Sequence, residues 1–248
     1  MKAILRLDFL KNIQDKGLLF WTIILPIIFT VLFISVFTNG ADPETQKEVI
    51  VSIVPGYIVM FVFFIMITMV DHILKDLQSG MTARLASTPL KSSSYLYGKW
   101  ITYFIIVLIQ IIILFTFGKI VYQIPMMQPI LLILFSIALS VMVTGLGLGL
   151  ALSVRTFNMG IAITQIIALG GALLSGLWVP HEFLPKMIQT IGKFLPQYWA
   201  HQSMQEAMLG TLRLQDFMFT LVILLAAGML GFIVAFSRYP AFLKRARN

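Results

Sequence analysis

Three Gly-Lys pairs are the residues of this chain that could hold a nucleotide phosphate. They begin at Gly98, Gly118 and Gly192. A phosphate-binding loop has the form Gly-x-x-x-x-Gly-Lys-Ser/Thr, because its backbone amides and its lysine surround the phosphates. None of the pairs has a glycine five positions earlier, or a serine or threonine after the lysine. We therefore predict that this chain does not hydrolyse ATP by itself.

Histidines and carboxylates could instead form a metal site or a catalytic group. His181, Glu182, His201 and Glu206 lie in one polar segment, but prolines separate them and their spacing is not that of metal ligands. The chain contains no cysteine, which excludes disulfides and thiolate ligands. No Ser-His-Asp set or pair of carboxylates can be identified. We predict no catalytic residue, no metal and no cofactor in this chain.

The elements that position these residues are long apolar runs. Hydrophobic residues make up 59% of the 248 residues, far above the average for soluble domains. A helix that spans a bilayer needs about 20 apolar residues and satisfies its backbone groups internally. The sequence therefore predicts an all-α polytopic membrane protein, with one transmembrane domain over 1–248. We place six spans at 18–38, 51–70, 99–118, 130–152, 159–179 and 217–237.

The charge distribution predicts the orientation of these spans. Thirteen of the 18 Lys and Arg residues flank the spans on one side, and the other side holds five, including Lys47 and Arg213. The positive-inside rule then puts both termini in the cytoplasm. The segment 1–16 has an apolar stripe that predicts an amphipathic helix lying on the cytoplasmic face. The absence of an Asn-x-Ser/Thr sequon fits a bacterial cytoplasmic membrane, and positive charge split among membrane-flanking clusters does not favour nucleic acid.

The external segment 179–213 is too polar and too broken by prolines to span a membrane. Leu184, Ile188 and Ile191 form one apolar stripe, and a second stripe follows Pro196. Proline can start a helix but interrupts the interior of one. We predict two short re-entrant helices joined at Pro196, seated either in the outer interface or as a plug over the bundle. An ordinary interfacial loop is the alternative.

Few polar residues lie within the predicted spans. Asp71 and His72 fall at the cytoplasmic end of the second span, where solvation explains them, so no proton or ion relay is indicated. Thr164 and Gln165 could line a path, although such groups also join neighbouring helices. Gly145 and Gly149 predict close helix packing rather than nucleotide binding, because they lie inside an apolar span.

Two motifs resemble those of type-2 ABC transporter permeases, the six-span ABCG-like exporters. The first is G-x-W-x-P-x-x-x-L-P followed by L-P-x-Y/W. Its residues here are Gly176, Trp178, Pro180, Leu184 and Pro185, and then Leu195, Pro196 and Tyr198.

The second motif is E-x-G-T-x-x-R-L-x-x-T-P-L followed by G-K. Its residues here are Gly80, Arg84, Leu85, Thr88, Pro89, Leu90, Gly98 and Lys99. The chain departs from this motif at Gln78, where the family usually has glutamate, and at Met81, where threonine is common. Asp76 is close enough to stand in for the missing charge.

The resemblance implies a permease subunit that works with a separate ABC ATPase, on which ATP and Mg²⁺ would bind. The ATPase would dock on the cytoplasmic loop 75–98, whose residues 76–89 we expect to form a short coupling helix. We expect the coupling contacts to come from Asp76, Gln78, Gly80, Arg84, Leu85 and Pro89. We expect an external gate at Trp178, Pro180, Leu184, Pro185, Ile188, Pro196 and Tyr198.

The family also implies a dimer, with a second copy or a sister permease enclosing the path. The expected function is export of an amphiphilic cargo such as a drug, a lipid or an antimicrobial peptide, as in multidrug resistance. Two alternatives share this architecture: a membrane sensor or scaffold that does not transport, and a channel. An ATPase encoded beside the chain would favour the exporter.

Overall fold

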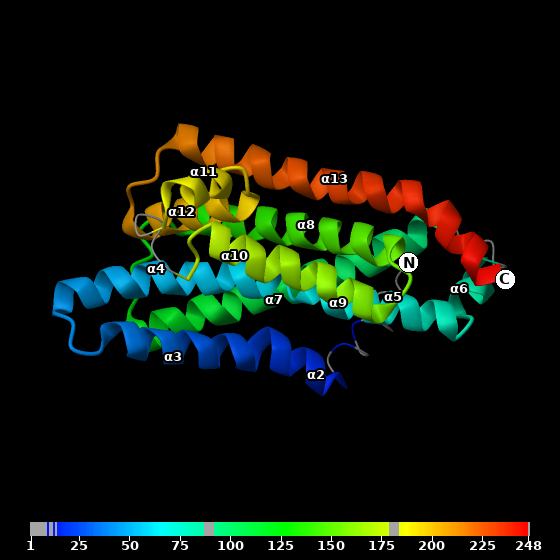
Figure 1. Cartoon of the computed structure of the whole chain (residues 1–248), viewed down its shortest axis with the longest axis horizontal. Coiled ribbons are helices and arrows are strands. Elements are labelled where there is room, and N and C mark those ends of the chain that lie inside the picture. The colour runs from blue at the N-terminus through cyan, green and yellow to red at the C-terminus, as the bar shows by residue number, and fades with distance from the viewer. Residues whose placement is uncertain (1–8, 10–11, 13, 87–91, 179–183, 248) are drawn as a thin grey trace.

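The computed structural model describes residues 9, 12, 14–86, 92–178 and 184–247 of the chain (Figure 1). The described part is all-helical. Its elements are α2 (Lys16–Leu19), the π-helix η1 (Phe20–Ile24), α3 (Leu25–Thr38), α4 (Pro43–Val62), α5 (Ile65–Gln78), α6 (Met81–Ala86), α7 (Ser92–Tyr122), α8 (Pro129–Ser153), α9 (Phe157–Gln165), the π-helix η2 (Ile166–Gly170), α10 (Gly171–Leu174), α11 (Lys186–Gly192), α12 (Pro196–Leu209) and α13 (Leu214–Arg247).

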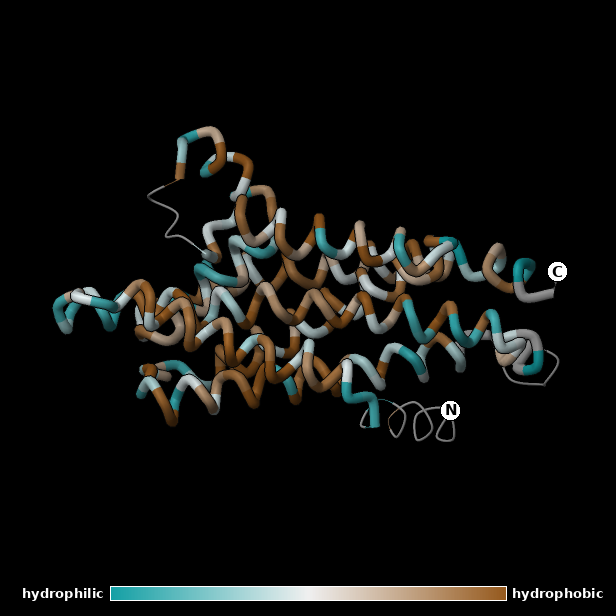
Figure 2. The backbone as a smooth tube through the Cα atoms, turned by 60° about the horizontal axis from the view of Figure 1, so that its bottom comes forward, coloured by the Kyte–Doolittle hydropathy of each residue, from teal (hydrophilic) through white to brown (hydrophobic). Residues whose placement is uncertain are grey.

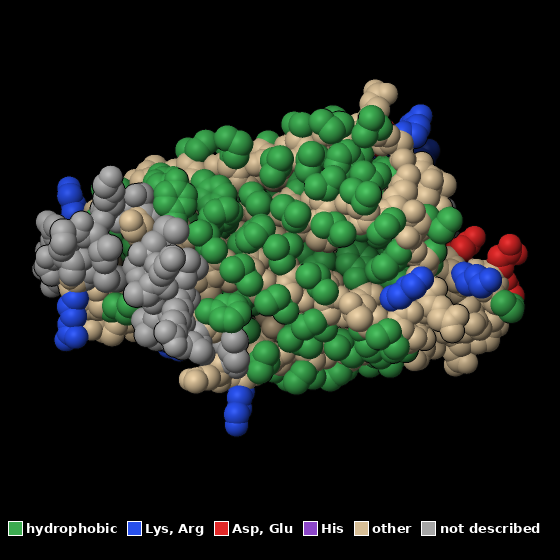
Figure 3. All heavy atoms as spheres, turned by 180° about the vertical axis from the view of Figure 1, so that it is seen from behind, with side chains coloured by type: hydrophobic (Ala, Val, Ile, Leu, Met, Phe, Trp, Pro, Cys, Tyr) green, Lys and Arg blue, Asp and Glu red, His purple; other side chains and the backbone are tan. Residues whose placement is uncertain are grey.

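Six helical stretches of the described residues are long and apolar enough to cross a membrane, which confirms the predicted fold class. They cover Lys16–Thr38, Pro43–Gln78, Ser94–Tyr122, Pro129–Ser153, Phe157–Leu174 and Leu214–Arg245. Hydrophobic residues run along the middle of the bundle and hydrophilic residues gather toward its two ends (Figure 2). A space-filling view shows the same pattern on one face, with apolar side chains between charged ends (Figure 3).

Several predicted boundaries were wrong by more than one turn. The second span reaches Gln78 because α4 and α5 follow one another through a single turn at Phe63 and Phe64, where hydrogen bonds to Met60 and Phe61 tighten the helix. The fifth span ends at Leu174 rather than at residue 179, because Gly176 turns the chain with a φ of +73°. Most of the predicted amphipathic segment 1–16 lies outside the described residues.

The start of α2, the short helix α6 and the end of α13 share one end of the bundle, while α11 and α12 lie at the other (Figure 1). We call these the α6 end and the α12 end. This arrangement agrees with the prediction that the start of the first span and the end of the sixth lie on the side of the loop between spans two and three. That the α6 end is cytoplasmic stays a prediction.

The helix α8 packs against α13 on one side and α5 on the other. A Cβ atom at Gly145 would lie 2.5 Å from the carbonyl oxygen of Gly228, and one at Gly149 would lie 2.6 Å from that of Gly231. On the α5 side, a Cβ at Gly147 would lie 2.6 Å from the sulfur of Met69. Small residues allow such contacts in lipid, where helix association depends on close packing. The predicted packing role of Gly145 and Gly149 is confirmed.

We expect Gly149→Ala to weaken the bundle, because the added methyl group meets backbone atoms that cannot turn aside. Overpacking of this kind costs roughly 1–3 kcal/mol. Gly170→Ala is the matched control, since a Cβ there has nothing within 4 Å. Thermal unfolding of both variants in the same detergent measures the difference, and equal midpoints would show that α8 and α13 separate easily.

Candidate functional site

A sharp corner joins α5 to α6 at the α6 end. The helix α5 ends at Gln78, Gly80 adopts a left-handed φ of +69°, and α6 begins at Met81. Glycine suits this position because a side chain is strained at positive φ. The predicted single helix 76–89 is therefore wrong: its described part consists of the end of α5 and the separate helix α6, and Pro89 lies outside the described residues.

The exposed part of this corner is what we call the coupling surface. Gln78 and Arg84 are exposed and Gly80 is half-buried, so these predicted contact residues do come together at one corner. The helix α6 also carries Leu85 and packs against α5 and α13. A displacement of this surface would therefore be passed directly to the spans that contain α5 and α13.

Asp76 does not belong to the exposed surface. Its carboxylate accepts a hydrogen bond from the ammonium of Lys99 at 2.7 Å, and the two side chains are only 7% and 1% exposed. The Tyr95 hydroxyl donates to the same carboxylate oxygen at 3.3 Å. The expectation that Asp76 offers an exposed contact is corrected, because a carboxylate so far from water needs a cation within the chain. Lys99, which the motif supplies, is that cation.

Aromatic contacts extend this ion pair to a third span. The Tyr95 ring stacks on that of Tyr239 in α13, with centroids 6.2 Å apart, and Lys99 lies 5.8 Å from the Tyr95 centroid. Arg245 donates to the carbonyl oxygens of Leu152 and Val154, which end α8. The α6 end is thus held by polar contacts among α5, α7, α8 and α13.

A second polar contact joins the N-terminal segment to the core. The Nδ1 atom of His72 lies 2.8 Å from the Tyr103 hydroxyl, and its Nε2 atom lies 3.6 Å from a carboxylate oxygen of Asp15. Asp15 also caps α2, because its other oxygen accepts from the backbone amides of Gly17 and Leu18. The interpretation of His72 as merely solvated was incomplete.

The two helices at the α12 end have different surroundings. In α11 the apolar stripe is largely at the surface: Met187 is 75% exposed, Ile191 is 39% exposed and Ile188 is half-buried. In α12 the predicted stripe is buried; its members Ala200, Met204, Ala207 and Met208 are all 0% exposed and Ser203 is 3% exposed. The second helix alone therefore takes the place of a plug, and we use that word for α12.

Polar side chains fix the plug to three neighbouring elements. Gln197 donates to the carbonyl oxygen of Ile167 in η2 at 2.8 Å. His201 Nε2 lies 2.9 Å from the carbonyl oxygen of Ser52 in α4, and since a carbonyl only accepts, this nitrogen carries the proton. Ser203 and Thr220 share a hydrogen bond of 2.7 Å between α12 and α13.

Two glycines make room for the plug. A Cβ at Gly171 would overlap the Gln197 amide, and a Cβ at Gly56 would lie 2.6 Å from the carbonyl oxygen of Leu177 and 3.3 Å from His201. At the far end of α12, the backbone amides of Met127 and Gln128 donate to its last carbonyls. The plug therefore has a seat formed by backbone as well as side chains.

The remaining predicted gate residues that the structure describes lie near the starts of α11 and α12 and beside α4. Pro185 precedes α11 and Pro196 is the first residue of α12, so both prolines start helices. Trp178 donates its indole N–H to the sulfur of Met60 at 2.8 Å. Leu184 and Tyr198 are half-buried, and burial followed by the charge of Glu206 raises the pKa of the Tyr198 hydroxyl. Pro180 lies outside the described residues.

The predicted path residues do not share one surface. Thr164 is 0% exposed on α9, which packs against α5, and its hydroxyl has no hydrogen-bond partner among the described residues. Gln165 is exposed on the same helix. A cavity of about 900 Å³ lies elsewhere, at the α12 end between α4, α7 and α12, with Glu48, Tyr122 and Gln202 in its wall.

Sequence reasoning missed Gln197 and the seat for His201. The signal that could have found them is a small residue on the facing helix, since Gly56 and Gly171 both stand opposite polar residues of α12. It also missed Lys99 as the partner of Asp76. The two are 23 positions apart, on helices joined by the loop, so no helical spacing brings them together.

We expect Lys99→Met to destabilise the chain strongly, because it leaves the Asp76 carboxylate buried without a cation. Breaking a buried pair in this way costs roughly 3–5 kcal/mol. The double variant Asp76→Asn with Lys99→Met should recover most of that loss. Lys75→Met is the control, since Lys75 pairs with Asp71 at the surface and such pairs contribute little. Denaturant titration in detergent would decide, and a Lys99→Met chain as stable as the control would contradict the buried pair.

Residues 1–209 match the family described as ABC-2 type transporter. The chain is 29% identical over 199 residues to YvfS of Bacillus subtilis (strain 168), named as a transport permease, and the match covers 76% of this chain and 77% of that protein. It is 28% identical over 177 residues to the linearmycin resistance permease protein LnrN of the same organism, covering 71% of this chain and 46% of that protein. A match over most of the chain, together with six membrane-spanning helices, shows that the chain belongs to the ABC-2 type transporter family and is a permease with a transport function.

Proposed function

We propose that this chain is the membrane subunit of an ABC exporter, which moves an amphiphilic cargo out of the cell with ATP hydrolysed by a separate subunit. The observation that carries the proposal is the helix α6, which stands at the corner of α5 beside the buried Asp76–Lys99 pair. A small exposed helix fixed to several spans is suited to receive a push. The sequence has no phosphate-binding loop of its own, so ATP and Mg²⁺ belong to the partner.

The coupling surface would transmit this push through the polar contacts of the α6 end. Arg84 is exposed and presents a guanidinium that can pair with a carboxylate of the ATPase. Behind it, α6 packs on α5 and α13, and the Asp76–Lys99 pair ties α5 to α7. A displacement of α6 therefore moves together the halves of these spans that lie nearest the α6 end. In this proposal the α6 end is cytoplasmic.

The plug would act as the outer gate. It closes the α12 end through the hydrogen bonds of Gln197, His201 and Ser203 and through its buried apolar stripe. Opening a path requires these contacts to break or to move with their neighbours. The partner residues lie on α4, η2 and α13, and each of these elements belongs to a span that also reaches the α6 end.

The proposed cargo is amphiphilic, such as a drug, a lipid or an antimicrobial peptide. One relative is named for resistance to linearmycin, which supports an exported antimicrobial and a role in multidrug resistance. A second copy or a sister permease would complete the path. The apolar windows of the first, fifth and sixth spans are each 28% buried within this chain, which leaves faces for lipid and for a neighbouring permease.

We expect vesicles that contain the chain and its ATPase to accumulate a fluorescent amphiphile when ATP is added outside, and Arg84→Glu to abolish most of this flux. The charge reversal replaces an attraction at the coupling surface by a repulsion, while ATP hydrolysis continues. Arg213→Glu is the matched control, because Arg213 is an exposed arginine at the other end of the bundle. Unchanged flux in the Arg84 variant would show that the α5–α6 corner is only a connector.

We expect Gln197→Ala to raise leakage of a small trapped dye several-fold in vesicles without nucleotide, because it frees one side of the plug from η2. Gln205→Ala serves as the comparison, since Gln205 is half-buried on the same helix and borders the external cavity rather than η2. Leakage that is equal in both variants would argue against α12 as a gate.

A further inference from the structure

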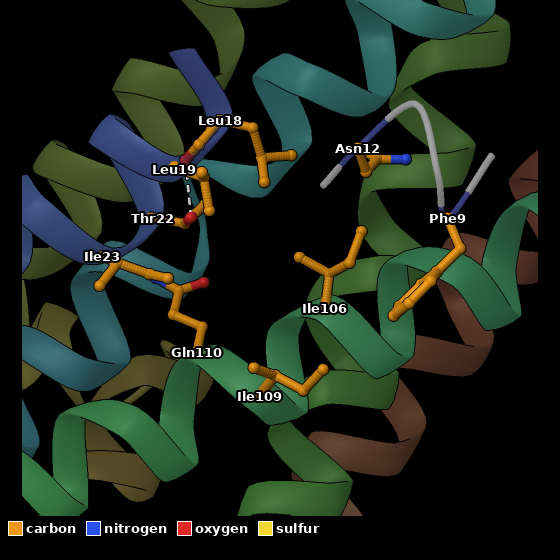
Figure 4. A pocket seen from close by; sticks show the side chains of 9 residues that line it. All are labelled: Phe9, Asn12, Leu18, Leu19, Thr22, Ile23, Ile106, Ile109 and Gln110. Carbon is orange, nitrogen blue, oxygen red and sulfur yellow. Dashed lines mark hydrogen bonds between the residues drawn. The ribbon is translucent and has the colours of Figure 1, made fainter. Parts of the chain in front are cut away.

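A cavity of about 240 Å³ lies between the N-terminal segment, η1 and α7 (Figure 4). Phe9 closes one end, Leu19 and Ile23 line the side formed by α2 and η1, and Ile106 and Ile109 line the side formed by α7. Leu19 is 38% exposed and Ile109 is 42% exposed. The cavity therefore lies directly beside the surface that faces lipid.

Gln110 is the polar residue on the α7 side of this cavity. It is 1% exposed, and neither its amide oxygen nor its amide nitrogen has a hydrogen-bond partner among the described residues. Figure 4 shows its side chain reaching from α7 toward Thr22 and Ile23. Gln110 lies near the middle of the span Ser94–Tyr122. An amide left without partners in hydrocarbon costs several kcal/mol, because no bulk water reaches it.

Two other polar residues line the cavity, Asn12 of the N-terminal segment and Thr22 of η1. The Thr22 hydroxyl donates to the carbonyl oxygen of Leu18 at 2.6 Å, so it is committed within its own helix. In contrast to Gln110, Thr144 in the neighbouring α8 accepts from the Trp100 indole at 2.9 Å and joins two helices. The lining of the cavity contains no charged residue. A molecule that fits must therefore be apolar over most of its surface, neutral, and able to hydrogen-bond with an amide, that of Gln110 above all.

We propose that this cavity binds an acyl chain of a neutral amphiphile whose ester, amide or hydroxyl group pairs with Gln110. The volume corresponds to about eight water molecules of roughly 30 Å³ each, which accommodates part of a chain rather than a whole lipid. The rest of the molecule lies past Leu19 and Ile109 in the bilayer. The irregular backbone of η1 forms one wall, as π-helical turns often do at functional sites. Binding at this cavity does not depend on the energy source of transport.

The test uses the purified chain in phosphatidylcholine vesicles that contain a monoacylglycerol with a diazirine in its acyl chain. After illumination, peptide mass spectrometry locates the label. We expect it on Leu19, Ile23 and Ile106. Gln110→Leu should lower labelling there about tenfold, the effect of one hydrogen bond made in a dry site. Ile106→Phe, which fills the cavity without touching the amide, should lower it as well.

Gln165→Leu is the matched control, because it makes the same change at an exposed glutamine of another span and should leave the labelling unchanged. Thermal unfolding confirms that each variant is folded. Labelling that is spread evenly over lipid-facing residues, and equal in all variants, would overturn the proposal. Labelling at the cavity that no variant lowers would also overturn it. That result would mean that water alone hydrogen-bonds the Gln110 amide.

A second probe distinguishes the source of the ligand. It is a phosphatidylcholine with the same diazirine acyl chain in place of the monoacylglycerol. If both probes label the cavity, the site takes an acyl chain of the surrounding bilayer. If the single-chain amphiphile alone labels it, the site selects molecules other than bulk lipid, among which an exported cargo would be found. Both results support the site.

Discussion

The second span, Pro43–Gln78, is the element on which both ends of the bundle depend. Of its most apolar window, 78% is buried, so the other helices pack around it. In hydrocarbon such a helix must satisfy its own backbone and any charge it carries. At one end it carries Gly56 and the Ser52 carbonyl, which receive the plug. At the other it carries Asp76, whose charge is balanced by Lys99.

The rest of the bundle divides into a tightly packed frame and more loosely held elements. The backbone contacts of Gly145 and Gly149 with α13 leave little room for movement between α8 and α13. Fewer contacts hold the plug to α4 and η2, namely the hydrogen bonds of His201 and Gln197 and the close approach at Gly56 and Gly171. If α6 is displaced, the frame resists and the weaker contacts at the other end yield. This difference in packing is the physical basis of the gating that we propose.

The sequence predicted the elements well and their polar contacts poorly. Run length and hydrophobicity located six spans, and the spacing of Gly145 and Gly149 located a close contact, because both signals are local. The partner of Asp76 could not be predicted, since burial of a carboxylate depends on how α5 and α7 pack. For the same reason the apolar stripe of α12 was predictable, whereas the roles of Gln197 and His201 emerge only from the glycines that face them. The cavity beside Gln110 depends on η1, whose irregular backbone has no sequence pattern that we recognised.

The central claim is that the second span links the coupling surface to the plug. The most direct measurement is the rate at which an external maleimide labels Ser203→Cys, a buried position of α12 in a chain that otherwise contains no cysteine. We expect slow labelling of the complex without nucleotide and faster labelling during ATP turnover. We expect the double variant Asp76→Asn with Lys99→Met, which leaves no unpaired buried charge, to remove this acceleration while ATP is still hydrolysed. A labelling rate that is the same with and without ATP turnover would contradict the account.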